Sequence, residues 1–362
     1  GVKIKANMVA EVLDAQGKTV GAYNTLTDAI AAAKDGDTVK LLQSCNGNGI
    51  VISTNKFSNK GLTVDFGGNT YTVGGVLVGS AGTGTNAFQL LQGGKVTFQN
   101  GSIVGVTEGT TPAEDTPNWH GAPAIVIQNY CDLTLKNMTV TGGDETVYTM
   151  SNNHGDVVIE DSTITAGKAK GYTSPAIAFD VCGYSSYDGV SVTVKGSSVI
   201  NGDIEVSRSS NNAKDVKLAL EGGTVSGELK IDSSIKPGDA TAITKTENVT
   251  LAAPSGYVWD GTGKLAKAVA QIGDTSYASL ADAIDAAQDG ETVKLLDDQS
   301  NYGRIDVTKN ITIDLNGKTV TNSASPMFST TGEVTIQNGT ITSSSACAAV
   351  SAYNKLTLSN VT

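Results

Sequence analysis

Three acidic residues carry the clearest chemical signal in the sequence. Asp180, Asp203 and Glu205 fall in short segments with the pattern of strands, at positions that we expect to border a groove. Asp180 and Glu205 are expected on neighbouring strands, about 5 Å apart, a separation that retaining glycosidases use for their two carboxylates. The competing interpretation, which we favour, is that outward-facing acids on a net-acidic protein are solvated and do no chemistry.

A second set of residues could bind carbohydrate. Trp119, Tyr172, Tyr184 and Tyr187 lie in segments of variable length, where their rings could stack on sugar faces while acids and amides take the hydroxyls. The alternative is that the tyrosines only hold their own glycine-rich loops in place. The candidate ligand-binding residues at the groove rims are Trp119, His120, Asp144, Glu145, His154, Tyr172, Tyr184, Tyr187 and Arg208.

Other ligand classes find little support. The four cysteines are far apart and fit no metal-ligand spacing, so we expect free thiols, no metal site and no cofactor. Aspartate-rich turns could hold calcium, but no calcium-loop motif is present. A net charge of −11 argues against a nucleic-acid partner, and the absence of an 18-residue apolar run argues against membrane insertion.

The segments that position these residues are repeated. Tyr23 to Leu42 and Tyr277 to Leu296 align without a gap and are identical at fourteen of twenty positions. Each copy predicts a short capping helix, over about 25–35 and 279–289, because an N-capping hydroxyl precedes an apolar stripe spaced i, i+3, i+4, i+7. Gly36 and Gly290 are expected to cap the helix C-termini in a left-handed conformation.

A ten-residue phrase recurs after each helix. It starts at Val96, Leu133, Val157, Val192, Leu218, Val334 and Leu356, and its apolar residues alternate, which is typical of a strand with one buried face. The fifth residue predicts a sharp corner, because Asn, Asp and Gly tolerate positive φ. The residues expected to turn inward again after the corner are Ile103, Val140, Ile164, Val199, Val225 and Ile341.

A third strand aligns between successive phrases, and alternation assigns its faces. A slip of one residue would reverse every assignment. The expected inward rows are Ile125, Tyr148, Ile177, Ile204 and Leu229, then Ile127, Met150, Phe179, Val206 and Ile231. The expected outward rows are Val126, Thr149, Ala178, Glu205 and Lys230, then Gln128, Ser151, Asp180, Ser207 and Asp232.

One bent phrase repeated in one register predicts an all-β solenoid, in which each turn of the chain pairs with the next. The pattern resembles the right-handed parallel β-helices of the pectin-lyase-like superfamily. More narrowly, it resembles β-helix modules of large surface proteins of Gram-positive, often gut-dwelling, bacteria. The residues that carry this resemblance are the helix openings, the phrase from Asp314 to Thr319, the NGT-type corners and the segment from Pro254 to Leu265.

The resemblance specifies a fold better than an activity, because the superfamily holds lyases, hydrolases and non-catalytic adhesins. Resemblance to the pectate lyases of this fold would imply calcium-binding aspartates and an arginine that acts as the base. This chain has two arginines in all, which argues against that activity. Polygalacturonases of this fold imply an Asp-Asp pair and a Gly-His-Gly. Here the one Asp-Asp pair is Asp297-Asp298, in the second module. His120 is preceded by Trp and His154 by Asn, so neither matches the Gly-His-Gly pattern.

We therefore expect two tandem modules. The first spans 1–265, with coils over about 38–253 and a closing segment at 254–265, and the second, truncated, spans 266–362 within a longer multi-module chain. The expected function is a secreted or cell-wall adhesin or scaffold that binds polysaccharide or host glycoprotein without catalysis. The alternatives are a polysaccharide lyase or glycoside hydrolase working around Asp180, Asp203 and Glu205, and a stalk with no ligand.

Overall fold

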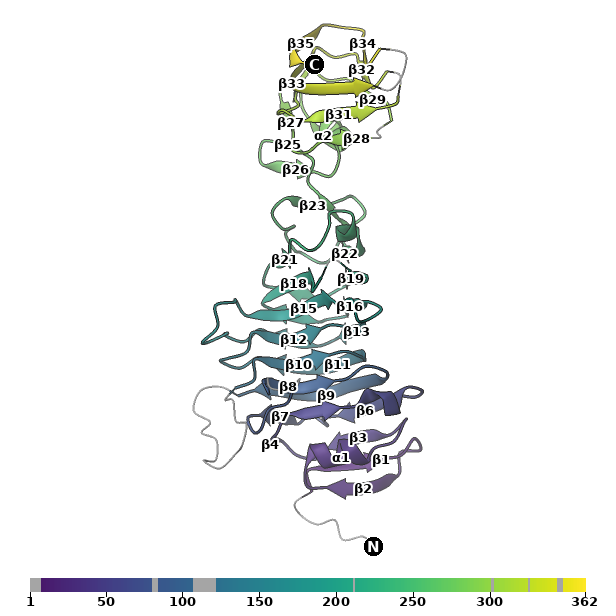
Figure 1. Ribbon diagram of the computed structural model, residues 1–362, viewed down its shortest axis with the longest axis vertical. Helices are drawn as coiled ribbons and strands as arrows, with labels where there is room; N and C mark the ends of the chain where they lie inside the picture. The colour runs from purple at the N-terminus through teal and green to yellow at the C-terminus, as the bar shows by residue number, and fades with distance from the viewer. Residues whose placement is uncertain are drawn as a thin grey trace. The chain divides into compact units, whose positions relative to one another are not determined.

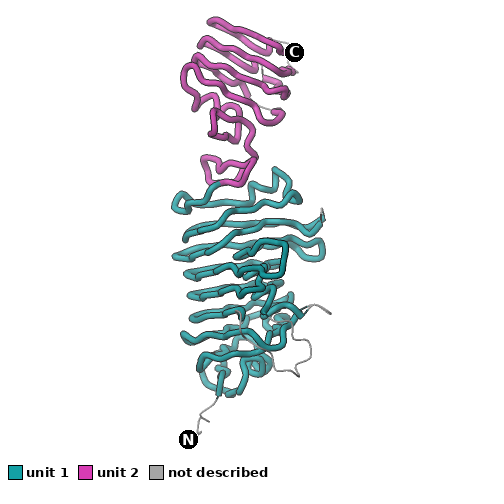
Figure 2. Tube along the Cα trace, turned by 90° about the vertical axis from the view of Figure 1, so that its left-hand side faces the viewer, with its two compact units in different colours: residues 1–252 teal, residues 253–362 magenta. Residues whose placement is uncertain are grey.

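The computed structural model describes residues 8–79, 84–106, 122–210, 212–300, 303–324, 326–343 and 348–362. The chain divides into two compact units, residues 1–252 and 253–362 (Figure 2). Strands make up 49% of the protein, and most pair in parallel sheets. The described residues contain two short α-helices. The chain is therefore all-β in class, as the repeats predicted.

The boundary between the units lies at 252/253, whereas the sequence placed it at 265/266. The segment 254–265 contains β23 (Tyr257–Trp259), which pairs antiparallel with β24 (Leu265–Lys267). Because β24 spans the expected boundary, this hairpin groups with the second unit.

The first unit opens with a small antiparallel arrangement and a helix (Figure 1). Strand β1 (Ala10–Leu13) pairs antiparallel with both β2 (Thr19–Tyr23) and β3 (Thr38–Leu41). Helix α1 (Leu26–Ala32) joins β2 to β3 and packs on all three strands. Its buried residues are Leu26, Ala29 and Ile30, the apolar stripe that the sequence predicted.

Both helices begin at the predicted N-caps. The Thr25 hydroxyl accepts the backbone N–H of Asp28 at 3.0 Å, and the Ser279 hydroxyl accepts that of Asp282 at 3.0 Å. These bonds satisfy N–H groups that the first helical turn leaves without a partner. The second helix, α2 (Leu280–Ala286), therefore repeats the first in length and capping.

Both helices end earlier than the sequence predicted. Gly36 and Gly290 have φ of +94° and +88°, but neither caps a helix, because the residue after each helix is already extended. The Asp37 carboxylate accepts the N–H of Lys34 at 2.8 Å, and the second unit repeats this bond. The carboxylate fixes a turn directly after the helix, so the helix stops before it reaches the glycine.

The copies of the ten-residue phrase form neighbouring strands of one parallel sheet. The residues that open five of the copies are direct partners across this sheet, in the order Val96, Leu133, Val157, Val192 and Leu218. Val96 also partners Leu62, and all six residues are buried. After β3, the strands in order are β6 (Leu62–Asp65), β9 (Lys95–Gly105), β11 (Asp132–Thr141), β13 (Gly155–Glu160), β16 (Val190–Lys195), β19 (Val216–Leu220) and β22 (Ile243–Lys245).

The predicted corner is present in every copy. Positive φ values between 47° and 65° occur at the fifth residue of six copies, namely Asn100, Asn137, Asp161, Gly196, Asn338 and Asn360. In the copy that starts at Leu218, the positive φ belongs to Gly223 rather than to Gly222. Asparagine amides also join successive corners, since Asn137 Nδ2 donates to Asn100 Oδ1 at 3.2 Å.

Beyond the corner the chain pairs again, with one residue shifted from the prediction. Ile103, Val140 and Ile164 are buried partners, as expected, but the next partner is Ile200 and not Val199. The corner at Gly196 contains one residue more than the corner at Asp161, which moves the inward position along by one. The short strands of this region are β4 (Cys45–Gly47), β7 (Thr70–Val73), β14 (Thr163–Thr165), β17 (Val199–Asn201) and β20 (Thr224–Val225).

A second parallel sheet of the first unit contains the predicted third strands, which lie one above another in Figure 1. Its strands in order are β5 (Ile50–Ile52), β8 (Asn86–Leu90), β10 (Ile125–Asn129), β12 (Tyr148–Asn152), β15 (Ile177–Gly183), β18 (Asp203–Arg208) and β21 (Leu229–Ile231). Two 3₁₀ helices complete the unit, η1 (Thr54–Phe57) and η2 (Asp239–Ala242).

The sequence assigned part of this second sheet to the wrong face. Val126, Thr149 and Ala178, predicted to face outward, are completely buried. Ile125 and Tyr148, predicted to face inward, are only half-buried. The alternation fails because two consecutive residues are fully buried near the start of β10 and β12, so the face of the first residue in each strand is reversed.

The next inward row follows the prediction as far as β15, but Ser151 and Asp180 of the next outward row are buried, so the expectation of a solvated Asp180 is wrong. Ile127, Met150 and Phe179 are buried partners. The ladder between β15 and β18 is irregular after Ile177, so that Asp180 partners Glu205 and not Ser207. This irregularity brings the two acids directly side by side.

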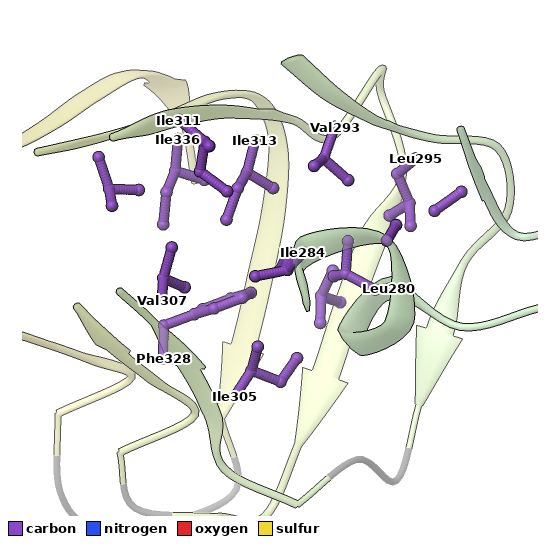
Figure 3. Packing of buried hydrophobic residues seen from close by; sticks show 14 of the residues in the cluster. Leu280, Ile284, Val293, Leu295, Ile305, Val307, Ile311, Ile313, Phe328 and Ile336 are labelled. Atoms are coloured by element: carbon purple, nitrogen blue, oxygen red, sulfur yellow. The ribbon is translucent and has the colours of Figure 1, made fainter. Parts of the chain in front are cut away.

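The second unit repeats the opening of the first. Its first sheet contains β25 (Ala270–Ile272), β26 (Thr275–Tyr277), β27 (Thr292–Leu295), β30 (Ile311–Asp314), β33 (Val334–Ser343), β31 (Thr319–Asn322), β28 (Gln299–Ser300) and β35 (Leu356–Val361). A three-stranded parallel sheet faces it, with β29 (Ile305–Val307), β32 (Phe328–Thr330) and β34 (Val350–Ala352). Aliphatic side chains from both sheets and from α2 fill the space between them (Figure 3).

The glycine that follows the corner residue Asn338 is closely packed, and replacing it tests the packing of the corner. A Cβ on Gly339 would lie 2.4 Å from Leu315 Cβ and 2.6 Å from the Lys318 carbonyl oxygen. We expect Gly339→Ala to lower the free energy of unfolding of the second unit by about 1–3 kcal/mol, because the neighbouring backbone must move. Urea denaturation measures this loss. Gly261→Ala is the control, since nothing lies within 4 Å of a Cβ at that position.

Candidate functional site

Four aromatic rings meet at one corner of the first unit. Tyr130 follows β10, His154 follows β12, and Tyr184 and Tyr187 follow β15. The His154 ring stacks on Tyr187, with centroids 5.1 Å apart and 22° between the planes. Tyr130 and Tyr184 lie 5.2 Å and 6.5 Å from Tyr187. Because successive strands of the sheet stack, residues that leave them at equivalent points gather into one aromatic cluster.

The aromatic cluster is held by its own loop and remains half-exposed. His154 Nδ1 lies 3.0 Å from the carbonyl oxygen of Gly189, which ties the histidine to the end of the loop that carries Tyr184 and Tyr187. Burial raises the pKa of Tyr130 and of Tyr184 from 10 to about 12. Both hydroxyls can donate hydrogen bonds at neutral pH, as an ordinary tyrosine can. Ring faces with polar edges are the usual platform for a sugar.

A groove of about 280 Å³ runs beside the aromatic cluster. Its charged and ring-bearing lining residues are Asp132, His154, Asp156, Asp188, Asp215 and Lys217. A second hollow of about 180 Å³ shares Asp132 and His154 with it and is also lined by Tyr130 and Lys95. The two hollows are therefore neighbours, and we call them together the corner groove.

The sequence-predicted acid pair is also brought together. Asp180 on β15 and Glu205 on β18 are direct partners across the sheet. Asp180 is 5% exposed, and its two carboxylate oxygens accept the N–H of Asn152 at 2.7 Å and the hydroxyl of Ser151 at 3.2 Å. The Tyr148 hydroxyl donates to Glu205 Oε1 at 3.2 Å.

Burial decides the charge of this pair. Loss of water around Asp180 raises its pKa to about 8, and the nearby carboxylate of Glu205 adds to the rise. Asp180 is therefore largely protonated at neutral pH while its neighbour stays exposed to water on one side. A protonated carboxyl beside a second carboxyl is an arrangement that acid–base catalysis can use.

Asp203 does not join the acid pair. Its carboxylate forms an ion pair with Lys230 at 2.6 Å and accepts the N–H of Glu228 at 2.9 Å. Burial alone would raise the pKa of Asp203, but the N–H group and the lysine outweigh burial and hold the pKa below its usual value. The three acids of the alternative catalytic hypothesis therefore divide into a pair and a separate ion pair.

The other predicted site residues are dispersed. Asp144 is buried and pairs with Lys168 at 2.7 Å, and Arg208 pairs with Asp239 at 2.9 Å. Tyr172 is 47% exposed, on the connection between β14 and β15. Glu145 lies half-buried between β11 and β12, whereas Trp119 and His120 lie outside the described residues.

Two residues of the site were missed or misplaced from the sequence. Tyr130 was not singled out, although it stands at the same corner as His154 and Tyr187, and alignment of the corners could have found it. Tyr148 was assigned to the core because of strict alternation. Among the described residues, no group of three or more His, Cys, Asp or Glu side chains is placed to hold a metal ion.

No helix that the structure describes is both long enough and apolar enough to span a membrane. Comparison of the chain with protein-family models, with curated proteins and with solved structures found no match.

Proposed function

We propose that this chain is a pair of right-handed parallel β-helix modules from a secreted or cell-surface protein, which binds glycans at the corner groove and catalyses no reaction. The fold proposal is supported by the in-register stacking of the repeated phrases and by the passage of the chain from one sheet to the other at each turn. Crossovers between parallel strands are right-handed in nearly all proteins. The sequence pattern also resembles that of β-helix modules in Gram-positive surface proteins.

The observation that carries the binding proposal is the aromatic cluster. Four rings from three successive turns of the chain meet beside a groove lined by carboxylates. A ring platform next to hydrogen-bond acceptors matches what a pyranose presents, which is an apolar face and a rim of hydroxyls. The alternative that the rings only hold their own loops in place predicts no ligand, so a binding measurement separates the two.

The acid pair favours a second candidate function, glycoside hydrolysis, in which Asp180 would donate a proton and Glu205 would attack. The raised pKa of Asp180 supports this reading. Its burial weighs against it, because both oxygens already accept hydrogen bonds and only 5% of the residue is exposed. We therefore rank binding above catalysis.

A glycan array probed with the intact chain tests the binding proposal. We expect Tyr187→Ala to weaken binding to the captured glycan by about tenfold, because the central ring of the aromatic cluster is lost. Tyr187→Phe keeps the ring and should bind nearly as well as the parent. Tyr172→Ala is the matched control, since this tyrosine is exposed and belongs to a different loop.

Equal binding by Tyr187→Ala and the parent would contradict the proposed site, and binding to no glycan would contradict the function. The same glycans are incubated with the chain and analysed for cleavage products. Release of products that stops in Asp180→Ala or Glu205→Ala would establish the hydrolase reading instead.

A further inference from the structure

We propose that the corner groove selects glycans that carry positively charged amino groups, such as oligomers of unacetylated amino sugars. This inference rests on the proposed glycan-binding function and specifies its ligand class. It is carried by the charges along the groove in combination with the ring platform.

The charges of the groove are arranged in order. Lys95 is the direct partner of Asp132, and Ser191 is the direct partner of both Asp156 and Lys217. The register between β11 and β13 aligns Asp132 with Asp156, which joins the five residues into one row. Acids therefore occupy the centre of this row and lysines its two ends. The adjacent corner loops add Asp188 and Asp215 to the same lining.

Most of these acids are open to a ligand. Asp156, Asp188 and Asp215 are exposed, whereas Asp132 is half-buried and accepts the N–H of Asp156 at 3.0 Å. In the part of the chain that the structure describes, none of the four forms an ion pair with a lysine or arginine. Four carboxylates around a shallow groove raise the local concentration of cations and repel uronic or sialic acids.

The aromatic cluster adds a reason for a sugar rather than a free cation. His154 belongs both to the groove lining and to the ring stack, so a pyranose resting on the rings places its substituents among the carboxylates. An ammonium group on that sugar would gain charge-assisted hydrogen bonds that a neutral acetamide cannot make. Charge and ring platform thus favour the same ligand.

Isothermal titration of the full chain compares a glucosamine oligomer with its N-acetylated counterpart of equal length, at a mildly acidic pH where the amines are charged. We expect tighter binding of the unacetylated oligomer and a steep loss of that preference with added salt. Asp156→Asn and Asp188→Asn should each weaken binding of the charged oligomer by about two- to fivefold. Lys217→Gln should strengthen it, and Asp274→Asn, which removes an acid from the second unit, should leave it unchanged.

Equal binding of the two oligomers, or preference for the acetylated or an acidic glycan, would overturn the inference and leave glycan binding standing. Binding to no oligosaccharide together with capture of a basic peptide would overturn both. The Asn variants keep the shape of the side chains, and their circular dichroism spectra show whether the fold is preserved.

Discussion

Asp180→Asn should make the first unit more stable at neutral and weakly alkaline pH. The folded-state pKa of Asp180 is raised from 3.8 to about 8, chiefly by burial, so the folded state holds a proton that the unfolded state releases. Below about pH 4 Asp180 is protonated in both states and does not destabilise the fold. As the pH rises from about 4 to about 8, the unfolded state is favoured increasingly, because only there can Asp180 ionise freely. Each unit of pKa shift corresponds to about 1.4 kcal/mol, so the loss amounts to several kcal/mol.

An asparagine removes this penalty without disturbing the packing. Its Oδ1 can still accept the N–H of Asn152, and its Nδ2 takes the place of the oxygen that faces Ser151, where it can donate to the hydroxyl. The variant has nothing to ionise at this position. Its free energy of unfolding should therefore change less with pH than that of the parent, and the two curves should diverge as the pH rises.

Urea denaturation followed by circular dichroism, repeated across this pH range, measures the effect. The difference between variant and parent cancels the pH dependence of the second unit. Asp203→Asn is the matched control, because its pKa is lowered by the N–H of Glu228 and by Lys230, so that this variant should lose stability at neutral pH. A parallel pair of curves for Asp180→Asn and the parent would show that Asp180 is ionised in the folded state.

The repeats in the sequence predicted the strands because each phrase carries its own evidence. Alternating apolar residues define a buried face, and an Asn, Asp or Gly at the fifth place defines the corner, whichever copy is considered. These signals are local, and they recur seven times. The helices were predicted for the same reason, since an N-cap and an apolar stripe lie within a few residues of each other.

The faces of the third strand could not be predicted, because alternation assumes a regular strand. Thr149 is a polar residue in a completely buried position, where its hydroxyl donates to the carbonyl oxygen of Thr165 at 2.8 Å. Because the partner lies on a different strand, the residues next to Thr149 in the sequence do not predict this bond. The corner insertion before Ile200 likewise shows only when two copies are compared as stacked turns.

The candidate site was predicted in part for a related reason. His154, Tyr184 and Tyr187 were found because they lie in loops of variable length, which often carry binding residues. Their assembly depends on the stacking order of the turns, which sequence spacing implies. The partnership of Asp180 with Glu205 depends on one irregular step in a ladder, and a regular alignment assigns each acid a different neighbour.

The core of the second unit offers the last strong test. Phe328 on β32 is completely buried, and its ring points toward Ile284 of α2, with Ile305 and Val307 on either side (Figure 3). No other aromatic residue belongs to the fully buried cluster of this unit among the described residues. Removal of the ring leaves a cavity that aliphatic side chains on rigid strands cannot close.

Phe328→Ala should therefore lower the free energy of unfolding of the second unit by about 3–5 kcal/mol. Hydrogen exchange of peptides from β30, β32 and α2 measures the loss of unfolding free energy in the second unit alone. Leu358→Ala is the control, because Leu358 is 56% exposed and its truncation should cost less than about 1 kcal/mol. Similar exchange rates in the two variants would mean that the ring does not hold helix and sheets together, and that the helix is a cover rather than part of the core.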